Sequence, residues 1–167
     1  AQSYQVDPIV RITADCPLID PVVCDRVVTE LINGNVNVVR TGQSFAEGLD
    51  CEVFSFNALE VAFYQAELAS EQEHVTLYFY NHPQYFQIKT IENVTYDGNY
   101  RFTVDQQEDL EVVKHIIENS EVESPISSEF IKNYLDNHPS IAQINSKVTR
   151  NEGFSKSLKS NQIGLKV

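Results

Sequence analysis

Short apolar runs rich in β-branched residues recur along the chain, and turn residues separate them. Runs of this kind are typical of buried strands. The first run, at residues 9–13, reads Ile-Val-Arg-Ile-Thr and leads into Ala-Asp-Cys-Pro, which indicates a strand followed by a turn. The same pattern predicts strands at residues 9–13, 36–39, 51–54, 86–91 and 100–104.

Between these runs the apolar residues take up helical spacing. Val23, Val27 and Leu31 form one apolar stripe, which begins after Asp20-Pro21, a pair typical of a helix start, and ends before Gly34. Further helices are predicted at residues 57–68, from a capping box at residues 70–73, from Asp105 to Glu118, and from Ser127 or Ser128 to Pro139. Because strands alternate with helices, the chain is predicted to form an α/β fold with helices packed on a sheet.

The charge is unevenly distributed along the chain. A formal net charge of -12 argues against a protein that binds nucleic acid by neutralising its phosphates. A small anionic substrate is compatible with this charge, because a metal ion or a local basic cluster can offset it. From residue 145 onward, five Lys or Arg residues stand against one Glu. We therefore expect one domain at residues 1–144 and a distinct basic tail at residues 145–167.

Two features bear on the compartment in which the protein works. The sequence contains no run of about 20 apolar residues that would cross a membrane, and its N-terminus does not have the pattern of a signal peptide. Cys16, Cys24 and Cys51 show no CxxC spacing, so reduced thiols are expected rather than a zinc site or a disulfide framework. We expect a cytoplasmic protein that does not bind a membrane.

The first candidate for chemistry is Asp15, which directly follows the strand predicted at residues 9–13. In open α/β sheets, ligands bind beyond the carboxyl ends of the strands, so a carboxylate at this place can point at a substrate. The structural alternative is an Asx-turn ahead of Pro17. Asp20, by contrast, is interpreted as the cap of the following helix.

The second candidate is Asp105, again at a predicted strand end. Asp105 and Glu108 have the spacing of a capping box, so a structural role explains Asp105 when it is considered alone. Together, however, Asp15 and Asp105 are two carboxylates at two strand ends, a set that can hold one Mg²⁺ against substrate phosphates. The spacing by itself does not establish that they converge.

Two further segments carry polar residues that suit a sugar. Asp50 and Glu52 alternate along a predicted strand and so share a face, which fits hydrogen bonding to hydroxyl groups and fits an ordinary solvated face equally well. Glu73 and His74 lie at a predicted helix start, where His74 is either a substrate ligand or an ordinary helix-start residue. The sequence has no Gly-rich phosphate loop and no Gly-x-Ser-x-Gly motif, which argues against a self-contained nucleotide hydrolase or dinucleotide enzyme.

Four segments in this order resemble the cytidylyltransferase family that includes spore-coat polysaccharide biosynthesis proteins and, more distantly, acylneuraminate and deoxy-manno-octulosonate cytidylyltransferases. The matching segments are IVRITADCPLIDP, GLDCEVFSFNALE, SEQEHVT and RFTVDQQEDLEVV, and INSKVTRNEGFSKSL also looks like an ending seen in this family. The resemblance covers residues 1–118 best.

The resemblance implies a three-layer nucleotide-diphosphosugar-transferase-like sandwich with a mainly parallel central sheet. It also implies Mg²⁺-dependent transfer of CMP from CTP to a sugar hydroxyl, with release of pyrophosphate. By motif, Asp15 and Asp105 would be the metal ligands. The substrate-binding residues carried over by motif are Arg11, Gly48, Asp50, Glu52, Glu73 and His74.

The sequence departs from the family pattern in two places. Ala14 stands where the family has Gly before Asp-Cys-Pro. In addition, the family's first strand and its basic, Gly-containing nucleotide-binding loop would precede Ala1. From this we expect a chain with little or no transferase activity of its own, and an uncovered sheet surface that indicates a homodimer, proteolytic trimming or a further partner segment.

Two other functions remain open at this stage. One is a non-catalytic interaction module that keeps the fold and docks a partner through its basic tail. The other is a nucleotide-sugar glycosyltransferase, because a fold alone does not separate two enzymes that share it.

Overall fold

Four short strands form one sheet in the computed structural model, which describes residues 1–120 and 125–150. The strands are β1 (Ile9–Arg11), β2 (Val38–Thr41), β3 (Glu52–Phe54) and β4 (Ile88–Ile91). Their order across the sheet is β1-β3-β2-β4, and β3 runs antiparallel to both β1 and β2, while β2 and β4 are parallel. Three of the four strands therefore point the same way, with β3 reversed between two of them.

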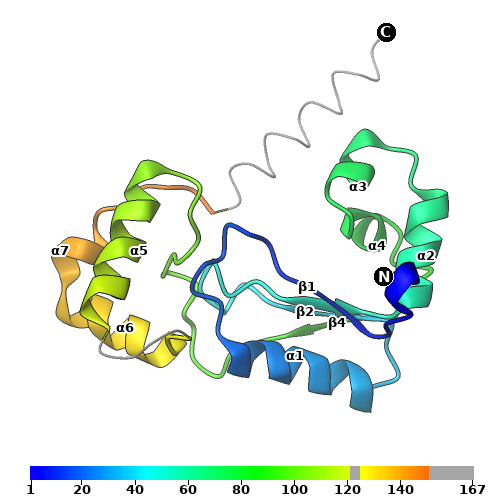
Figure 1. The fold of residues 1–167 in the computed structure, drawn as a ribbon, viewed down its shortest axis with the longest axis horizontal. Helices are drawn as coiled ribbons and strands as arrows, with labels where there is room; N and C mark the ends of the chain where they lie inside the picture. Colours follow the sequence, from blue (N-terminus) through cyan, green and yellow to red (C-terminus); the bar gives the residue numbers. More distant parts are fainter. Residues whose placement is uncertain (121–124, 151–167) are drawn as a thin grey trace, which may run out of the picture.

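Helices lie on both sides of this sheet and beyond one of its ends. Those described are α1 (Pro21–Asn33), α2 (Phe56–Gln65), α3 (Ala69–Glu73), α4 (Leu77–Asn81), α5 (Gln107–Asn119), α6 (Ser128–Asn137) and α7 (Pro139–Ala142), after a 3₁₀ turn at Gln2–Tyr4. Figure 1 shows α1 along one face, α2 to α4 over one end of the other face, and α5 to α7 beyond the opposite end of the sheet. The predicted α/β fold is confirmed. No helix in the described part of the chain is long and apolar enough to cross a membrane.

The alternation of side chains along the strands separates two apolar clusters. Val39 and Val53 are fully buried and belong to the cluster that includes Val27 of α1. Their neighbours Val38 and Phe54 point to the other face and pack in a cluster with residues of α2 and α4. β2 and β3 are thus apolar on both faces, which explains why their sequences read as continuous apolar runs.

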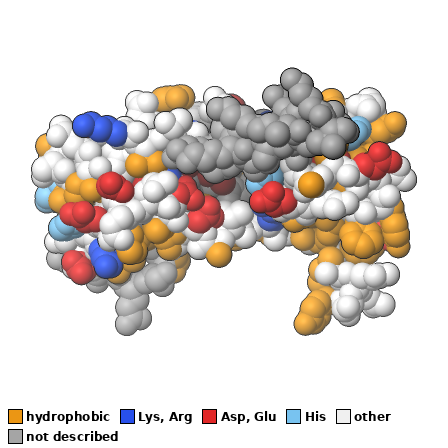
Figure 2. Space-filling view, turned by 90° about the horizontal axis from the view of Figure 1, so that it is seen from above, with side chains coloured by type: hydrophobic (Ala, Val, Ile, Leu, Met, Phe, Trp, Pro, Cys, Tyr) orange, Lys and Arg blue, Asp and Glu red, His pale blue; other side chains and the backbone are white. Residues whose placement is uncertain are grey.

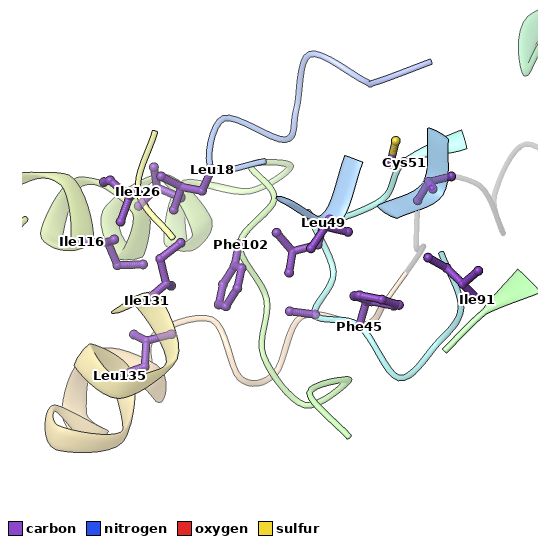
Figure 3. Packing of buried hydrophobic residues seen from close by; sticks show 14 of the residues in the cluster. Leu18, Phe45, Leu49, Cys51, Ile91, Phe102, Ile116, Ile126, Ile131 and Leu135 are labelled. Carbon is purple, nitrogen blue, oxygen red and sulfur yellow. The ribbon is translucent and has the colours of Figure 1, made fainter. Parts of the chain in front are cut away.

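The larger cluster continues past the sheet to the helices at its end. Phe102, which is fully buried, lies between Leu49 on the sheet side and Ile116 and Ile131 on α5 and α6 (Figure 3). Phe102 therefore anchors the chain segment that carries Asp105 to the main body of the protein.

The strand predicted at residues 100–104 is absent, and that prediction was wrong. In this segment only Arg101 forms a β-bridge, with Glu47. Phe102 donates its N–H to the carbonyl of Glu47 at 2.6 Å, and Val104 donates its N–H to the carbonyl of Asp15 at 2.8 Å. The segment is extended and buried because it bridges two loops rather than joining a sheet, which gives the same apolar pattern as a strand.

Both predicted capping boxes use a different acid from the one expected. At α3, Glu71 rather than Glu73 lies near the backbone N–H of Leu68, at 3.5 Å. At α5, Asp109 rather than Glu108 accepts from the N–H groups of Asp105 and Gln106, at 3.0 and 2.9 Å. α3 begins earlier than predicted and α5 begins later, so the acid at the third helical position is Glu71 in α3 and Asp109 in α5. Glu73 and Asp105 are not the capping acids of these two helices.

Other predicted caps are confirmed. Asp20 accepts from the N–H of Val22 at 2.9 Å, and its other oxygen accepts from the N–H of Ser128 at 2.9 Å. Ser127 caps α6 by accepting from the N–H of Phe130 at 3.2 Å. Asp20 therefore joins the starts of two helices that are far apart in the sequence.

The predicted basic tail begins with residues that contact the domain. Asn145 is buried, and its side-chain amide donates to Asp109 at 3.0 Å and to the carbonyl of Arg101 at 3.3 Å. Arg150 donates to the carbonyl of Phe45 at 3.0 Å. The rest of the predicted tail, residues 151–167, lies outside the described residues.

Candidate functional site

A cavity of about 590 Å³ opens where β1 and β2 end, between the loops that follow them and the segment of α3 and α4. The structure brings seven of the eight sequence-predicted site residues to its wall. These seven are Arg11, Asp15, Asp50, Glu52, Glu73, His74 and Asp105.

Gly48 is not among the lining residues, but it shapes the loop that carries Asp50. Its backbone has a φ of 101°, a conformation that side chains rarely allow. A Cβ atom there would lie 2.6 Å from the backbone nitrogen of Thr103. Glycine is therefore needed for the close contact between this loop and the segment of Asp105. The N–H of Gly48 also donates to the carboxylate of Asp50 at 2.9 Å.

Asp15 and Asp105 line the same cavity because their backbones are tied together. The carbonyl of Asp15 accepts from the N–H of Val104 at 2.8 Å and from the hydroxyl of Thr103 at 3.0 Å. Asp15 is half-buried, while the side chain of Asp105 is 47% exposed. The two carboxylates thus reach the cavity from two segments joined at its edge.

Asp15 and Asp105 offer carboxylate oxygens to a metal ion at the cavity wall. Carboxylate oxygens are ligands that Mg²⁺ prefers, and it usually takes one or two of them together with waters and phosphate oxygens. Within residues 1–120 and 125–150, no three His, Cys, Asp or Glu side chains gather in a way that could hold a metal. Asp15 and Asp105 place two carboxylates on the wall of one cavity, a number that a magnesium site can use.

Arg101 lies beneath Asp105 and contacts three carboxylates. Its guanidinium donates to Asp109 through Nε and Nη2, at 2.7 and 2.9 Å, to Asp105 through Nη2 at 2.6 Å, and to Glu47 through Nη1. Burial by itself lowers the pKa of Arg101, but hydrogen bonds to Asp109 and Glu47 outweigh it and raise this pKa above its usual value. Burial likewise tends to raise the pKa of Asp109, yet hydrogen bonds from Arg101 and from backbone amides hold it below its usual value.

Glu52 holds the opposite wall of the cavity together. Its carboxylate accepts from Arg11 at 2.7 Å, from the hydroxyl of Thr76 at 2.8 Å and from the hydroxyl of Tyr80. Burial, reinforced by the negative charge of Glu52, raises the pKa of Tyr80 well above its usual value. Glu52 therefore ties the sheet to α4, in addition to any contact it makes with a ligand.

Sequence reasoning missed several lining residues, and Arg40 is the most informative. In the sheet Glu52 pairs with Arg11 on one side and with Arg40 on the other. Arg40 lies over the ring of Tyr80, 4.2 Å from its centroid. The signal was one Arg within the first apolar run and another directly after the second, but only knowledge of the strand order places both beside Glu52. Thr76 and Tyr80 gave no comparable signal.

The charges around the cavity are mainly negative. Six acids line it, against the two cationic residues Arg11 and Arg40 and the lone histidine His74. On the face shown in Figure 2, Asp and Glu side chains gather near the middle of the molecule. A cavity wall with an excess of negative charge favours the binding of a cation or of groups that donate hydrogen bonds.

Comparison with known proteins identifies the family. The model of the family described as cytidylyltransferase matches residues 1–144. This chain belongs to the cytidylyltransferase family. The matched range contains all eight of the predicted site residues, so the cavity is part of the family's own domain.

Relatives of this cytidylyltransferase-family chain include one experimental structure. The solved structure of a cytidylyltransferase from Leptospira borgpetersenii serovar Hardjo-bovis superposes with a TM-score of 0.79 at 32% sequence identity, covering 85% of this chain and 61% of that one. This likeness confirms that the sheet and helices described above form a nucleotidyltransferase-like α/β fold.

Two curated proteins are also similar. An uncharacterized protein of Methanocaldococcus jannaschii is 36% identical over 152 residues, which cover 87% of this chain and 60% of that protein. The spore coat polysaccharide biosynthesis protein SpsF of Bacillus subtilis is 28% identical over 146 residues, which cover 80% of this chain and 57% of SpsF. The chain thus spans about three fifths of the length of the relatives it matches.

Proposed function

We propose that this chain provides the metal-binding and acceptor side of a sugar cytidylyltransferase. In the proposed reaction a sugar hydroxyl attacks the α-phosphorus of CTP, the bond to the β-phosphate oxygen breaks, and pyrophosphate leaves as CMP joins the sugar. The observation that carries the proposal is that Asp15 and Asp105, from two separate segments, line one cavity in a domain that belongs to the cytidylyltransferase family.

The two carboxylates have a defined part in this proposal. Asp15 and Asp105 would hold Mg²⁺, which when bound neutralises charge on the phosphates of CTP. The hydrogen bonds of Thr103 and Val104 to the carbonyl of Asp15 keep the two carrying segments together. The chain's own contribution is therefore to keep the two carboxylate-bearing segments together before the substrate arrives.

The acceptor would occupy the part of the cavity lined by Asp50, Glu73 and His74. Carboxylates accept hydrogen bonds from sugar hydroxyls, and Asp50 is oriented by the N–H of Gly48. Glu52 has three hydrogen-bond partners within the protein, so we assign it chiefly to holding Arg11 and Tyr80 in place.

The composition of this cavity is evidence for a low transferase activity of this chain alone. A triphosphate needs several cationic or N–H donors, whereas the cationic residues described at the cavity are Arg11 and Arg40. Arg11 is already paired with Glu52, and Arg40 lies against Tyr80. We therefore propose that Mg²⁺-CTP binds weakly and that pyrophosphate release is close to background.

The biological context of the proposal is the synthesis of surface polysaccharide. Its support is the similarity to SpsF of Bacillus subtilis, a spore coat polysaccharide biosynthesis protein. The three free cysteines support a reducing compartment such as the cytoplasm.

Chemical-shift mapping by NMR tests the proposed site directly. Adding CTP with Mg²⁺ is expected to shift the amide resonances around Thr13, Asp15 and Asp105, and CTP without Mg²⁺ at the same concentration should shift them less. Shifts confined to another surface, or equal shifts with and without Mg²⁺, would contradict the proposal.

A further inference from the structure

We infer that Arg101 is the positioning residue for Asp105, so that the affinity of the cavity for a divalent cation depends on the geometry of this arginine. The inference rests on the proposed function, in which Asp105 is a metal ligand. It goes further by assigning a role to Arg101, which does not line the cavity among the described residues.

The geometry of the contacts supports this role. Arg101 is 8% exposed and binds Asp109 through two parallel N–H···O bonds, the fork geometry that fixes a guanidinium plane. The same Nη2 atom then donates to Oδ2 of Asp105 at 2.6 Å. Although the side chain of Asp105 is 47% exposed, this contact ties one of its oxygens to the protein.

Asp109 is held as firmly as the arginine that it binds. It is fully buried and also accepts from the N–H groups of Asp105 and Gln106 and from the amide of Asn145. Asp109 therefore fixes both the backbone of Asp105 and, through Arg101, its side chain. A carboxylate located at two points in this way has little freedom to leave the cavity wall.

Arg101 also joins this segment to the loop of Gly48 and Asp50. Its Nη1 donates to Glu47, which is buried, and the backbone of Glu47 bonds to Tyr100 and Phe102 on either side of Arg101. One side chain thus links the proposed metal side of the cavity to the proposed acceptor side.

The test is Mn²⁺ affinity, measured by electron paramagnetic resonance on the full chain with Mn²⁺ alone as the probe. Arg101→Lys keeps the positive charge but cannot form the fork, so Mn²⁺ affinity is expected to fall by about tenfold. The control Arg26→Lys, on an exposed arginine that donates to the carbonyl of Glu92, should leave the affinity unchanged. A further control, Ile131→Val, lowers stability without touching Asp105 and should also leave it unchanged.

Asp105→Asn separates this inference from the proposed function. If Asp105→Asn weakens Mn²⁺ binding and Arg101→Lys does not, the positioning role is wrong and the proposed metal site stands. If Asp105→Asn has no effect, the proposed metal site itself is wrong, and the inference falls with it.

A measurement on the unaltered chain covers the case in which Arg101→Lys does not fold. Titration with Mg²⁺ is expected to shift the Nη2–H resonance of Arg101, because this group donates to Oδ2 of Asp105 and a cation on Asp105 draws charge from that oxygen. A resonance that stays in place while the amide of Asp105 shifts would overturn the inference.

Discussion

Thr103 donates its hydroxyl hydrogen to the carbonyl of Asp15 at 3.0 Å, across 88 positions of sequence. The next residue, Val104, donates its N–H to the same carbonyl at 2.8 Å. These two bonds close the edge of the cavity and bring the carboxylates of Asp15 and Asp105 to one wall. This junction, rather than a strand pairing, holds the two carboxylate-bearing segments together.

Replacing Thr103 with Val tests the junction, because Val keeps the shape and removes the hydroxyl. Thr103 is buried, so losing one hydrogen bond is expected to lower the free energy of unfolding by about 1 kcal/mol. Urea denaturation measures this change. Thr29→Val, at an exposed position on α1, is the control and should change the free energy by less than about 0.5 kcal/mol. Equal effects at both positions would contradict the structural role.

Gly48→Ala is expected to be more damaging. Alanine at a φ of 101° is strained, and its Cβ would meet the backbone of Phe102 and Thr103 at 2.7 and 2.6 Å. We expect a loss of about 2 kcal/mol or more in the free energy of unfolding. Gly42→Ala is the matched control, since its Cβ would meet only the end of the Glu92 side chain, which can move. Thermal or urea unfolding that ranks Gly42→Ala as the worse variant would contradict this reading of the loop.

Stability should depend on Asp109 in acid. Its pKa is lowered in the folded state, so its contribution is present above the unfolded value of about 3.9 and is lost as the pH falls through the folded value. Asp109→Asn leaves Arg101 with one charged partner fewer and is expected to cost about 3 kcal/mol at pH 7. The loss should shrink as the pH falls below about 3.9, where the unfolded chain takes up the proton, and it should be smallest below the lowered folded pKa, where the folded carboxylate is protonated as well.

Glu108→Gln is the control for this experiment. Glu108 is exposed, and the sequence alone would have named it as the capping residue. Urea unfolding at pH 7 and pH 3 should show a change below about 0.5 kcal/mol for Glu108→Gln at both values. A larger effect at Glu108 than at Asp109 would restore the sequence-based interpretation of the cap.

The cysteines should react slowly in the folded chain. Burial raises the pKa of Cys16 to about 11 and that of Cys51 further still, and only the thiolate reacts with alkylating agents. Labelling with iodoacetamide at pH 8, followed by mass spectrometry, is expected to be roughly 100-fold slower at Cys16 than in the urea-unfolded chain. Equal rates in the two states would show that Cys16 is accessible and ionised.

The sequence predicted the elements with strong periodic patterns. The stripe of Val23 and Val27 placed α1, and Asp20 was correctly interpreted as its cap. These predictions succeeded because the signals are local: a helix face and an N-cap depend on residues within a few positions.

The failures involve contacts that are distant in sequence. Residues 100–104 have the sequence pattern of a strand, but their apolar character comes from Phe102, which enters the core. The segment is extended because it forms backbone hydrogen bonds with Glu47 on one side and with the carbonyl of Asp15 on the other. Alternation of apolar and polar residues does not distinguish a segment that pairs with a strand from one that lies between two loops. For the same reason Arg40 was overlooked, although it flanks Glu52 in the sheet.

The candidate site was predicted residue by residue through family resemblance, and the geometry adds what the residues do for one another. The sequence offered Asp15 and Asp105 as separate strand-end acids, and it gave no indication that Arg101 and Asp109 hold one of them. Buried ion pairs of this kind depend on the strand order and on the path of the loops, and local sequence patterns do not predict either.

Isothermal titration calorimetry with CTP in the presence and absence of Mg²⁺ tests the central claim most directly. We expect binding that requires Mg²⁺ and that weakens by about tenfold or more in both Asp15→Asn and Asp105→Asn. Glu118→Gln, which removes an exposed acid on α5, should bind like the unaltered chain. No Mg²⁺-dependent binding, or binding that both Asp variants retain in full, would contradict the assignment of this cavity as the metal and CTP site.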